Sequence, residues 1–163
     1  MAATPALELL IASGRKYRVH EYAHNPTASY GLEAAEALGT EPGRVFKTLV
    51  VEVPGGMAVG VVPVNTELDL KAMARALGVK RATMAQPAAA ERATGYVIGG
   101  ISPLGQKRRL RVVVDESASK WQTVFVSGGQ RGLELELDPA DLIALANASC
   151  APLGRPAMRH GHE

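Results

Sequence analysis

The sequence contains one cysteine, Cys150, and few aromatic residues, which make up 4% of its 163 residues. A single thiol cannot form an internal disulfide, and it also excludes a zinc site with four cysteine ligands. This scarcity of cysteine is typical of a reducing compartment, so we expect a cytoplasmic protein. Because aromatic rings are rare, Val, Leu, Ile and Ala must supply the hydrophobic core.

Long apolar runs and a strong net charge are also missing. No run approaches the roughly 20 residues that a membrane-spanning helix needs, and residues 1–13 lack the leading Lys or Arg of a signal peptide. We therefore expect no membrane partner. The net charge of +2 is too small to hold nucleic acid by bulk charge alone, although it leaves room for a local basic patch.

The usual combinations of catalytic and metal-binding side chains are absent as well. The sequence has no Gly-x-Ser-x-Gly nucleophile elbow, and Cys150 has no obvious histidine partner. His20 and His24 are four residues apart, but no acid or third ligand accompanies them at metal-site spacing. We therefore expect neither a metal nor a cofactor. If the protein is an enzyme, catalysis must come from positioning, electrostatics or the substrate itself.

What the sequence does contain predicts a single α/β domain. It is 47% hydrophobic and 21% charged, and its 17 glycines and 10 prolines favour short elements joined by tight turns. Helices are expected at residues 5–13, 32–38, 70–77 and 87–92 and from Pro139, and strands at residues 17–22, 45–53, 110–115, 123–126 and 133–137. This mixture predicts an α+β fold with a mostly antiparallel, barrel-like sheet over residues 1–150, followed by a flexible tail at residues 151–163.

Lys47 interrupts an otherwise apolar strand. Within residues 45–53 it shares its face with four aliphatic residues, Val45, Leu49, Val51 and Val53. Burying an unpaired ammonium is costly. Either the side chain extends to water near the strand end, or it is held at the mouth of an apolar pocket, aimed at a carbonyl oxygen or a phosphate. The residues alone leave both interpretations open.

Two glycine-rich segments could bring a ligand close to the backbone. These are residues 99–105 (GGISPLG) and residues 127–129 (SGG), and consecutive amides in such segments can bind an anion. Each could equally be a structural turn. Basic residues follow the first segment and also lie on and after the helix expected at residues 70–77, where they are either solvated surface or phosphate contacts.

Three segments together resemble a known family. Residues 45–49 (VFKTL), 94–107 (TGYVIGGISPLGQK) and 126–133 (VSGGQRGL) closely resemble the YbaK/EbsC family in content, order and spacing, and the similarity extends to about residue 145. The bacterial Cys-tRNA(Pro) deacylases of that family match best. The resemblance implies a mixed β-barrel with surrounding helices, and a free-standing trans-editing enzyme that removes cysteine mischarged onto proline tRNA.

The resemblance also implies the site residues and the partners. The family lysine corresponds to Lys47, which is expected to be catalytic. The other pocket positions are expected to bind substrate: Tyr22, Tyr30, Thr48, Gly99, Gly100, Ile101, Ser102, Ser127, Gly128 and Glu134. The family often has phenylalanine where this chain has Tyr30 and aspartate where it has Glu134. The implied partners are the acceptor end of mischarged tRNA(Pro) and prolyl-tRNA synthetase.

The implied chemistry needs no protein nucleophile. The cysteinyl thiolate would attack its own ester carbonyl, close a thiolactone and expel the 3′-oxygen of the terminal adenosine. Backbone amides near Gly100 and Ile101 and the ammonium of Lys47 would stabilise the developing charge. Two alternatives stay open: removal of alanine from tRNA(Pro) by water, and a binding module that holds the acceptor end without turnover.

Overall fold

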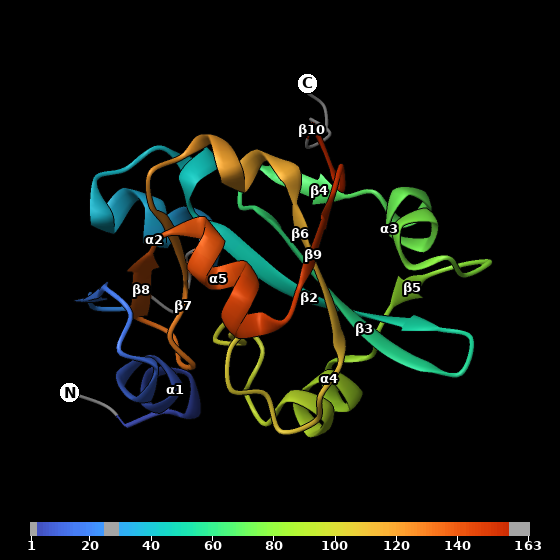
Figure 1. Cartoon of the computed structure of the whole chain (residues 1–163), viewed down its shortest axis with the longest axis horizontal. Coiled ribbons are helices and arrows are strands. Elements are labelled where there is room, and N and C mark those ends of the chain that lie inside the picture. The colour runs from blue at the N-terminus through green and yellow to red at the C-terminus, as the bar shows by residue number, and fades with distance from the viewer. Residues whose placement is uncertain (1–2, 25–29, 157–163) are drawn as a thin grey trace.

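The computed structural model describes residues 3–24 and 30–156, and Figure 1 shows the course of the chain. Its helices are α1 (Pro5–Ser13), α2 (Tyr30–Leu38), α3 (Leu70–Leu77), α4 (Pro87–Thr94) and α5 (Pro139–Ala146), with 3₁₀ turns η1 (Pro42–Arg44) and η2 (Glu116–Lys120). Its strands are β1 (Tyr17–Glu21), β2 (Phe46–Val53), β3 (Gly56–Pro63), β4 (Thr66–Leu68), β5 (Thr83–Met84), β6 (Arg111–Asp115), β7 (Val124–Ser127), β8 (Leu133–Leu137), β9 (Ser149–Ala151) and β10 (Gly154–Pro156). The predicted mixture of strands and short helices in one domain is confirmed.

The helix ends carry the signals that the sequence predicts. The side chain of Thr4 accepts a hydrogen bond from the first turn of α1, and the carboxylate of Asp69 does the same for α3. Gly14 and Gly78 follow these helices in the left-handed conformation, with φ values of 70° and 71°. No helix in the described part of the chain is long and apolar enough to cross a membrane.

Strands β2 and β3 lie at the centre of a five-stranded sheet with the order β5-β2-β3-β6-β9. β2 pairs antiparallel with β3 from Phe46 to Val53, whereas β6 pairs in parallel with both β3 and β9. On its other side, β2 pairs with β5 only at Val51 and Glu52. The first half of β2 therefore has an edge that β5 does not cover.

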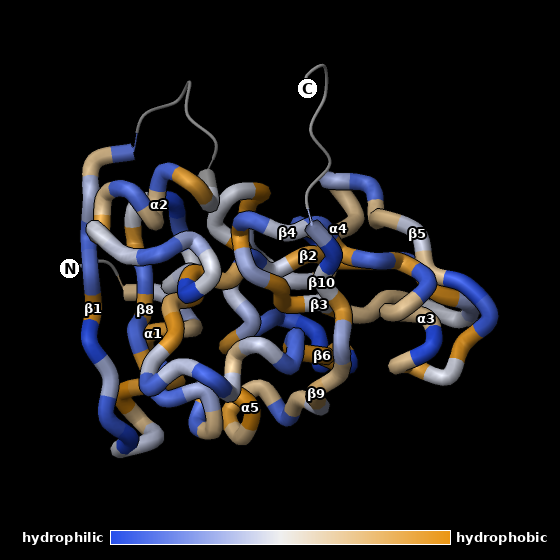
Figure 2. The backbone as a smooth tube through the Cα atoms, turned by 90° about the horizontal axis from the view of Figure 1, so that it is seen from above, coloured by the Kyte–Doolittle hydropathy of each residue, from blue (hydrophilic) through white to orange (hydrophobic). Residues whose placement is uncertain are grey.

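This sheet is buried on both faces. Figure 2 shows hydrophobic residues along β2, β3 and β6, with α3 to one side of them and α5 to the other. One face packs against α1, α4, α5 and the second sheet through Phe46, Val50, Val59, Val61, Val112 and Val114; the other packs against α3 through Val51, Ala58, Val62 and Val113. A strand that is covered on both faces shows no polar alternation, which is why the sequence did not predict β3.

A three-stranded antiparallel sheet, with the order β1-β8-β7, lies beside the first sheet, on the left in Figure 1. A single bridge between Val45 and Phe125 joins the start of β2 to β7. Ala34 and Ala35 of α2 pack over this junction. Among the described strands the sheets do not close into a barrel, because one bridge is their only strand pairing. The expected barrel-like sheet is therefore two sheets that meet at a corner.

Regular structure continues past residue 150. β9 pairs with β6, and β10 pairs with β4. The buried carboxylate of Asp115, at the end of β6, accepts hydrogen bonds of 2.8 Å from the backbone N–H groups of Leu153 and Gly154. The tail predicted to be flexible from residue 151 is thus held in the fold as far as Pro156, and residues 157–163 lie outside the described residues. Strands of three residues are too short to show periodicity, so no pattern in the sequence indicates them.

We expect Asp115→Ala to lower the free energy of unfolding by roughly 2–4 kcal/mol, because it leaves three backbone N–H groups, those of Ser117, Leu153 and Gly154, without their acceptor. Urea unfolding checks the magnitude, and amide hydrogen exchange should show faster exchange at Leu153 and Gly154. The neighbouring exposed residue supplies the control variant, Glu116→Ala, which should change neither. Unaltered exchange at the two amides in Asp115→Ala would contradict this role.

Candidate functional site

A small cavity lies at the uncovered edge of β2, where this strand approaches α2, β7, β8 and the loop after α4. Its volume is about 70 Å³. A water molecule needs about 10–15 Å³ on this measure, so the cavity has room for a few waters or one small side chain. It brings together these predicted site residues from distant parts of the sequence: Tyr22, Lys47, Thr48, Gly99, Ile101, Ser127 and Glu134.

Lys47 is partly buried at this cavity. It projects from the face of β2 on which Leu49 and Val51 pack under α3. Burial lowers the pKa of its ammonium below the ordinary value, and the charge of Glu67 partly offsets this effect. Lys47 forms no ion pair with a described residue. An ammonium in this setting is suited to stabilising negative charge on a ligand.

Glu134 contributes a buried carboxyl to the same cavity. It is 7% exposed and lies in β8 between His20 of β1 and Ser127 of β7. Burial raises the pKa of this carboxyl to about 8, so most of it is protonated at neutral pH. With the described residues the carboxyl makes no hydrogen bond or ion pair, and it is therefore available to a ligand.

Tyr22 and Thr48 add two hydroxyl groups. Burial, reinforced by the charges of Glu134 and Glu33, raises the pKa of Tyr22 to about 12, so its phenol stays protonated. The hydroxyl of Thr48 is buried and has no hydrogen-bond partner among the described residues. Buried polar groups are normally hydrogen-bonded, so an unpaired hydroxyl at a cavity points to a ligand or water that would pair with it.

Ser127 holds the two glycine-rich segments together. Its hydroxyl donates to the carbonyl oxygen of Gly100 at 3.0 Å and accepts from the N–H of Gly129 at 3.1 Å. A Cβ on Gly100 would lie 2.8 Å from the Cα of Gln130, so only glycine permits this approach of the two loops.

The expected use of the Gly100 amide needs correction. This N–H already donates to the carbonyl oxygen of Val97 at 2.9 Å, so it is committed to a turn. The N–H of Ile101 donates to no described residue, and Ile101 lines the cavity. The Gly100 donor is therefore committed within the loop, whereas Ile101 lines the cavity with a backbone donor that no described residue accepts.

The remaining predicted residues do not line the cavity or lie outside the described residues. Ser102 is fully buried, and its hydroxyl accepts from the N–H of Leu104 within a turn. A Cβ on Gly128 would lie 2.6 Å from the side chain of Leu133, so this glycine serves close packing. Tyr30 opens α2, but its side chain lies outside the described residues.

Sequence reasoning missed the apolar wall of the cavity. Gly31, Ala34, Val45, Phe46 and Val64 complete the lining. A Cβ on Gly31 would meet the side chain of Val64 at 2.6 Å, so the glycine lets α2 approach the end of β3 closely. No spacing in the sequence could reveal this contact, because its two residues lie on separate elements.

The chemistry available here is acid, hydroxyl, ammonium and backbone amide. In the described part of the chain, no group of three or more His, Cys, Asp or Glu side chains could hold a metal ion. The lining residues include no Ser–His or Cys–His pair. The cavity can therefore bind and polarise a small polar ligand, while any bond-breaking must start from a group that the ligand brings.

Comparison with known proteins finds the same family by two routes. Residues 24–145 match the family described as "Aminoacyl-tRNA editing domain". The chain is 37% identical over 151 residues to the "Putative Cys-tRNA(Pro)/Cys-tRNA(Cys) deacylase EbsC" of Enterococcus faecalis, covering 92% of each protein. It is 27% identical to the "Multifunctional Ser/Thr-tRNA deacylase ProXp-y" of Escherichia coli, over 93% of this chain and 92% of that one.

A solved structure has the same fold. The crystal structure of "a putative trans-editing enzyme for prolyl tRNA synthetase" superimposes with a TM-score of 0.80 at 28% identity, covering 94% of this chain and 99% of that one.

Glu134→Gln should stabilise the protein increasingly as the pH rises from 5 to 8. The carboxyl has an ordinary pKa of about 4.3 when unfolded and a pKa of about 8 when folded. Between these values the unfolded state releases a proton that the folded state keeps, so wild-type stability falls with rising pH by up to about 1.4 kcal/mol per pH unit. The glutamine variant lacks this loss. Chemical denaturation of both proteins at several pH values checks the trend.

Glu136→Gln is the matched control for this pH series. Burial alone would raise the pKa of the Glu136 carboxyl, but hydrogen bonds from Thr123 and His20, together with the charge of Arg44, lower it below its ordinary value. Its removal should destabilise the protein throughout the same range. A difference between Glu134→Gln and wild type that is constant from pH 5 to pH 8 would show that the Glu134 carboxyl is already ionised.

Proposed function

The chain belongs to the aminoacyl-tRNA editing domain family, and from this premise we propose that it removes mischarged cysteine from tRNA(Pro) as a free-standing deacylase. It would act in the cytoplasm on the acceptor end of the tRNA, in association with prolyl-tRNA synthetase. The observation that carries the proposal is a small cavity lined by the ammonium of Lys47 and the buried carboxyl of Glu134. Its lining contains no His or Cys that could form or activate a nucleophile.

The size of the cavity supports a small aminoacyl group. At about 70 Å³ it can receive an amino acid of the size of cysteine or alanine but not a nucleotide. The carboxyl of Glu134 is suited to the α-amino group, because a nearby ammonium would lower its raised pKa and convert it to a paired carboxylate. The ester carbonyl would then lie toward Lys47 and the N–H of Ile101, which no described residue accepts.

Cleavage would begin with the thiol of the substrate. The thiol loses its proton to solvent, and the thiolate sulfur attacks the ester carbonyl carbon, so that a C–S bond forms. The bond from this carbon to the 3′-oxygen then breaks, and the oxygen takes up a proton to become the 3′-hydroxyl. Cysteine leaves as a thiolactone, which water opens. Intramolecular attack gains an effective molarity on the order of 10⁵ M or more in favourable geometries, so positioning supplies most of the catalysis.

Selectivity would follow from the same step. Alanine and proline carry no thiol, so their esters would survive even when they enter the cavity. A fit of size alone discriminates by only about 1–3 kcal/mol per methylene group. The second candidate is alanine removal by water, which the buried Thr48 hydroxyl favours because it could hold that water. A relative that acts on Ser- and Thr-tRNA indicates that hydroxyl-bearing amino acids belong in the same assay.

Lys47→Ala should slow deacylation of Cys-tRNA(Pro) by about 10²–10³-fold, the usual effect of removing one group that stabilises an oxyanion. Single-turnover release of cysteine measures this rate. Circular dichroism should show an unchanged fold, because Lys47 is only partly buried. The control variant is Lys16→Ala, which removes an exposed lysine just before β1 and should keep the wild-type rate. A Lys47→Ala protein with full activity would exclude this ammonium from the reaction.

A panel of tRNA(Pro) charged with cysteine, alanine, serine or proline separates the candidate reactions. Attack by the substrate thiol predicts fast release of cysteine only, with a thiolactone that an added amine nucleophile traps. Release of alanine at a comparable rate without a thiolactone would favour the water mechanism. Tight binding of the charged tRNAs without any release of amino acid would indicate that the protein is a binding module and not an enzyme.

A further inference from the structure

The basic residues of the chain are concentrated in one stretch. Residues 71–111 contain nine Lys and Arg and one acid, a net charge of +8, whereas the rest of the chain carries nine basic and fifteen acidic side chains, a net charge of −6. The total of +2 hides this asymmetry. All nine are exposed, and we call them the basic face: Lys71, Arg75, Lys80, Arg81, Arg92, Lys107, Arg108, Arg109 and Arg111.

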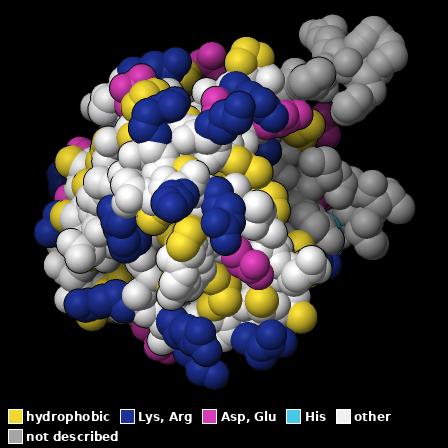
Figure 3. All heavy atoms as spheres, turned by 90° about the vertical axis from the view of Figure 1, so that its right-hand side faces the viewer, with side chains coloured by type: hydrophobic (Ala, Val, Ile, Leu, Met, Phe, Trp, Pro, Cys, Tyr) yellow, Lys and Arg dark blue, Asp and Glu magenta, His cyan; other side chains and the backbone are white. Residues whose placement is uncertain are grey.

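The fold brings separate parts of this stretch together. The guanidinium of Arg111 donates to the carbonyl oxygen of Leu77, which ties the start of β6 to the end of α3. The backbone N–H groups of Lys107 and Arg108 donate to the last turn of α4, beside Arg92. In Figure 3, which looks onto the side of the molecule with α3 and β5, dark-blue basic side chains extend from the top to the bottom and outnumber the acidic ones.

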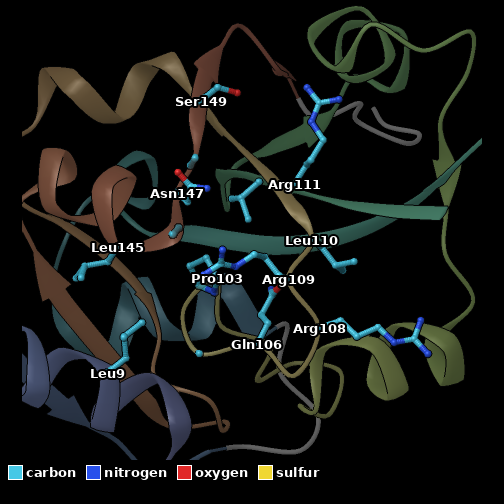
Figure 4. Close-up of a pocket in the computed structure, with 14 residues that line it drawn as sticks. Leu9, Pro103, Gln106, Arg108, Arg109, Leu110, Arg111, Leu145, Asn147 and Ser149 are labelled. Carbon is cyan, nitrogen blue, oxygen red and sulfur yellow. The ribbon is translucent and has the colours of Figure 1, made fainter. Parts of the chain in front are cut away.

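The basic face has two hollows. One, of about 530 Å³, is lined by the side of α3 and the turn after it, with Lys71, Arg75, Lys80 and Arg81. The other, of about 650 Å³, lies between α1, the end of α5 and the loop before β6, with Arg108, Arg109 and Arg111 (Figure 4). Among the described residues, no Asp or Glu lines either hollow.

None of these cations forms an ion pair with a carboxylate in the described part of the chain. By contrast, Arg15, Arg44 and Arg155, which lie outside this stretch of sequence, each pair with an acid. Two acids within or next to this stretch of sequence have hydrogen-bond partners of their own: Asp69 caps α3, and Glu91 accepts a hydrogen bond from the N–H of Ile98. Nine neighbouring cations without ion pairs repel one another, and a polyanion that binds there relieves the repulsion.

We propose that the basic face binds the phosphate backbone of the RNA whose charged end enters the Lys47 cavity. This inference rests on the proposed function, because the cavity of about 70 Å³ has room for the aminoacyl end alone. The remainder of the RNA must lie on the outer surface. Phosphates contacted by Lys and Arg fix the position of a nucleic acid without reading its sequence, so the basic face would orient the substrate and not select it.

The relation of α3 to Lys47 supports this orientation. α3 covers the face of β2 from which Lys47 projects, through contacts with Leu49 and Val51. From Val51 to Lys47 the strand spans about 13 Å at 3.3 Å per residue. A helical stem that lies against α3 could therefore direct an unpaired 3′ end along β2 to the cavity.

The test replaces three of these cations in the variant Lys71→Gln/Arg75→Gln/Lys80→Gln. The control, Lys16→Gln/Arg18→Gln/Lys120→Gln, removes the same residue types from exposed positions elsewhere. The probe is uncharged tRNA(Pro) transcript, whose dissociation constant is measured from 50 to 200 mM salt. We expect about tenfold weaker binding by the first variant at low salt and a salt slope smaller by about 0.9 for each phosphate that the variant no longer neutralises. The control should bind like wild type.

Two further measurements keep the inference separate from the proposed function. If wild type binds tRNA through the basic face but releases no amino acid, the function fails and the inference stands. If cysteine is released but both variants bind tRNA equally well, the inference is overturned. A 3′-cysteinyl ester of adenosine, which has no stem, should be cleaved equally by all three proteins. The inference would also be overturned if the first variant bound phosphatidylserine vesicles more weakly than wild type but bound tRNA equally well.

Discussion

Strand β2 is covered by protein on both of its faces, and this constraint decides where a ligand can reach the sheet. In the first half of the strand, between the two cores, a ligand can approach along the part of the edge that β5 leaves uncovered. α2, β7 and β8 close over that part without filling it. The small cavity is the space that remains, and Lys47 occupies the position in β2 where a charged group can be partly buried and still reach it.

The electrostatic state of the cavity follows from the same burial. The pKa of Lys47 is lowered and that of Glu134 is raised, so each group is shifted toward its neutral form. Two groups that formed an ion pair would shift in the opposite directions, because each charge would favour the other. Glu136, which pairs with Arg44, shows that opposite shift, because its pKa is lowered despite burial. The pKa of Asp115 is also lowered despite burial, by hydrogen bonds alone. The cavity thus holds a carboxyl and an amine that do not pair with each other. A charged ligand group could pair with either of them.

The backbone around the cavity is held by Gly100, which does not line it, and by Ser127, which does. Gly100 permits the close approach of the loop after β7, and the hydroxyl of Ser127 joins both loops. Next to this junction, the N–H of Ile101 donates to no described residue. The proposed chemistry, which begins from a group on the substrate, needs such positioning more than it needs a protein nucleophile. The chain belongs to the aminoacyl-tRNA editing domain family.

Local sequence was sufficient for features that depend on neighbouring residues. The helix caps at Thr4 and Asp69, the alternation in β8 and the odd position of Lys47 in an apolar strand are all visible in the sequence alone, because each involves residues within a few positions of one another. The order and spacing of the glycine-rich segments also indicated the family. Tertiary structure alone decided the rest. The burial of Glu134, the commitment of the Gly100 amide to Val97, the contact of Gly31 with Val64 and the strand β10 each depend on how sheets and loops pack. Burial and hydrogen-bond competition are properties of the packed chain, and no spacing along the sequence encodes them.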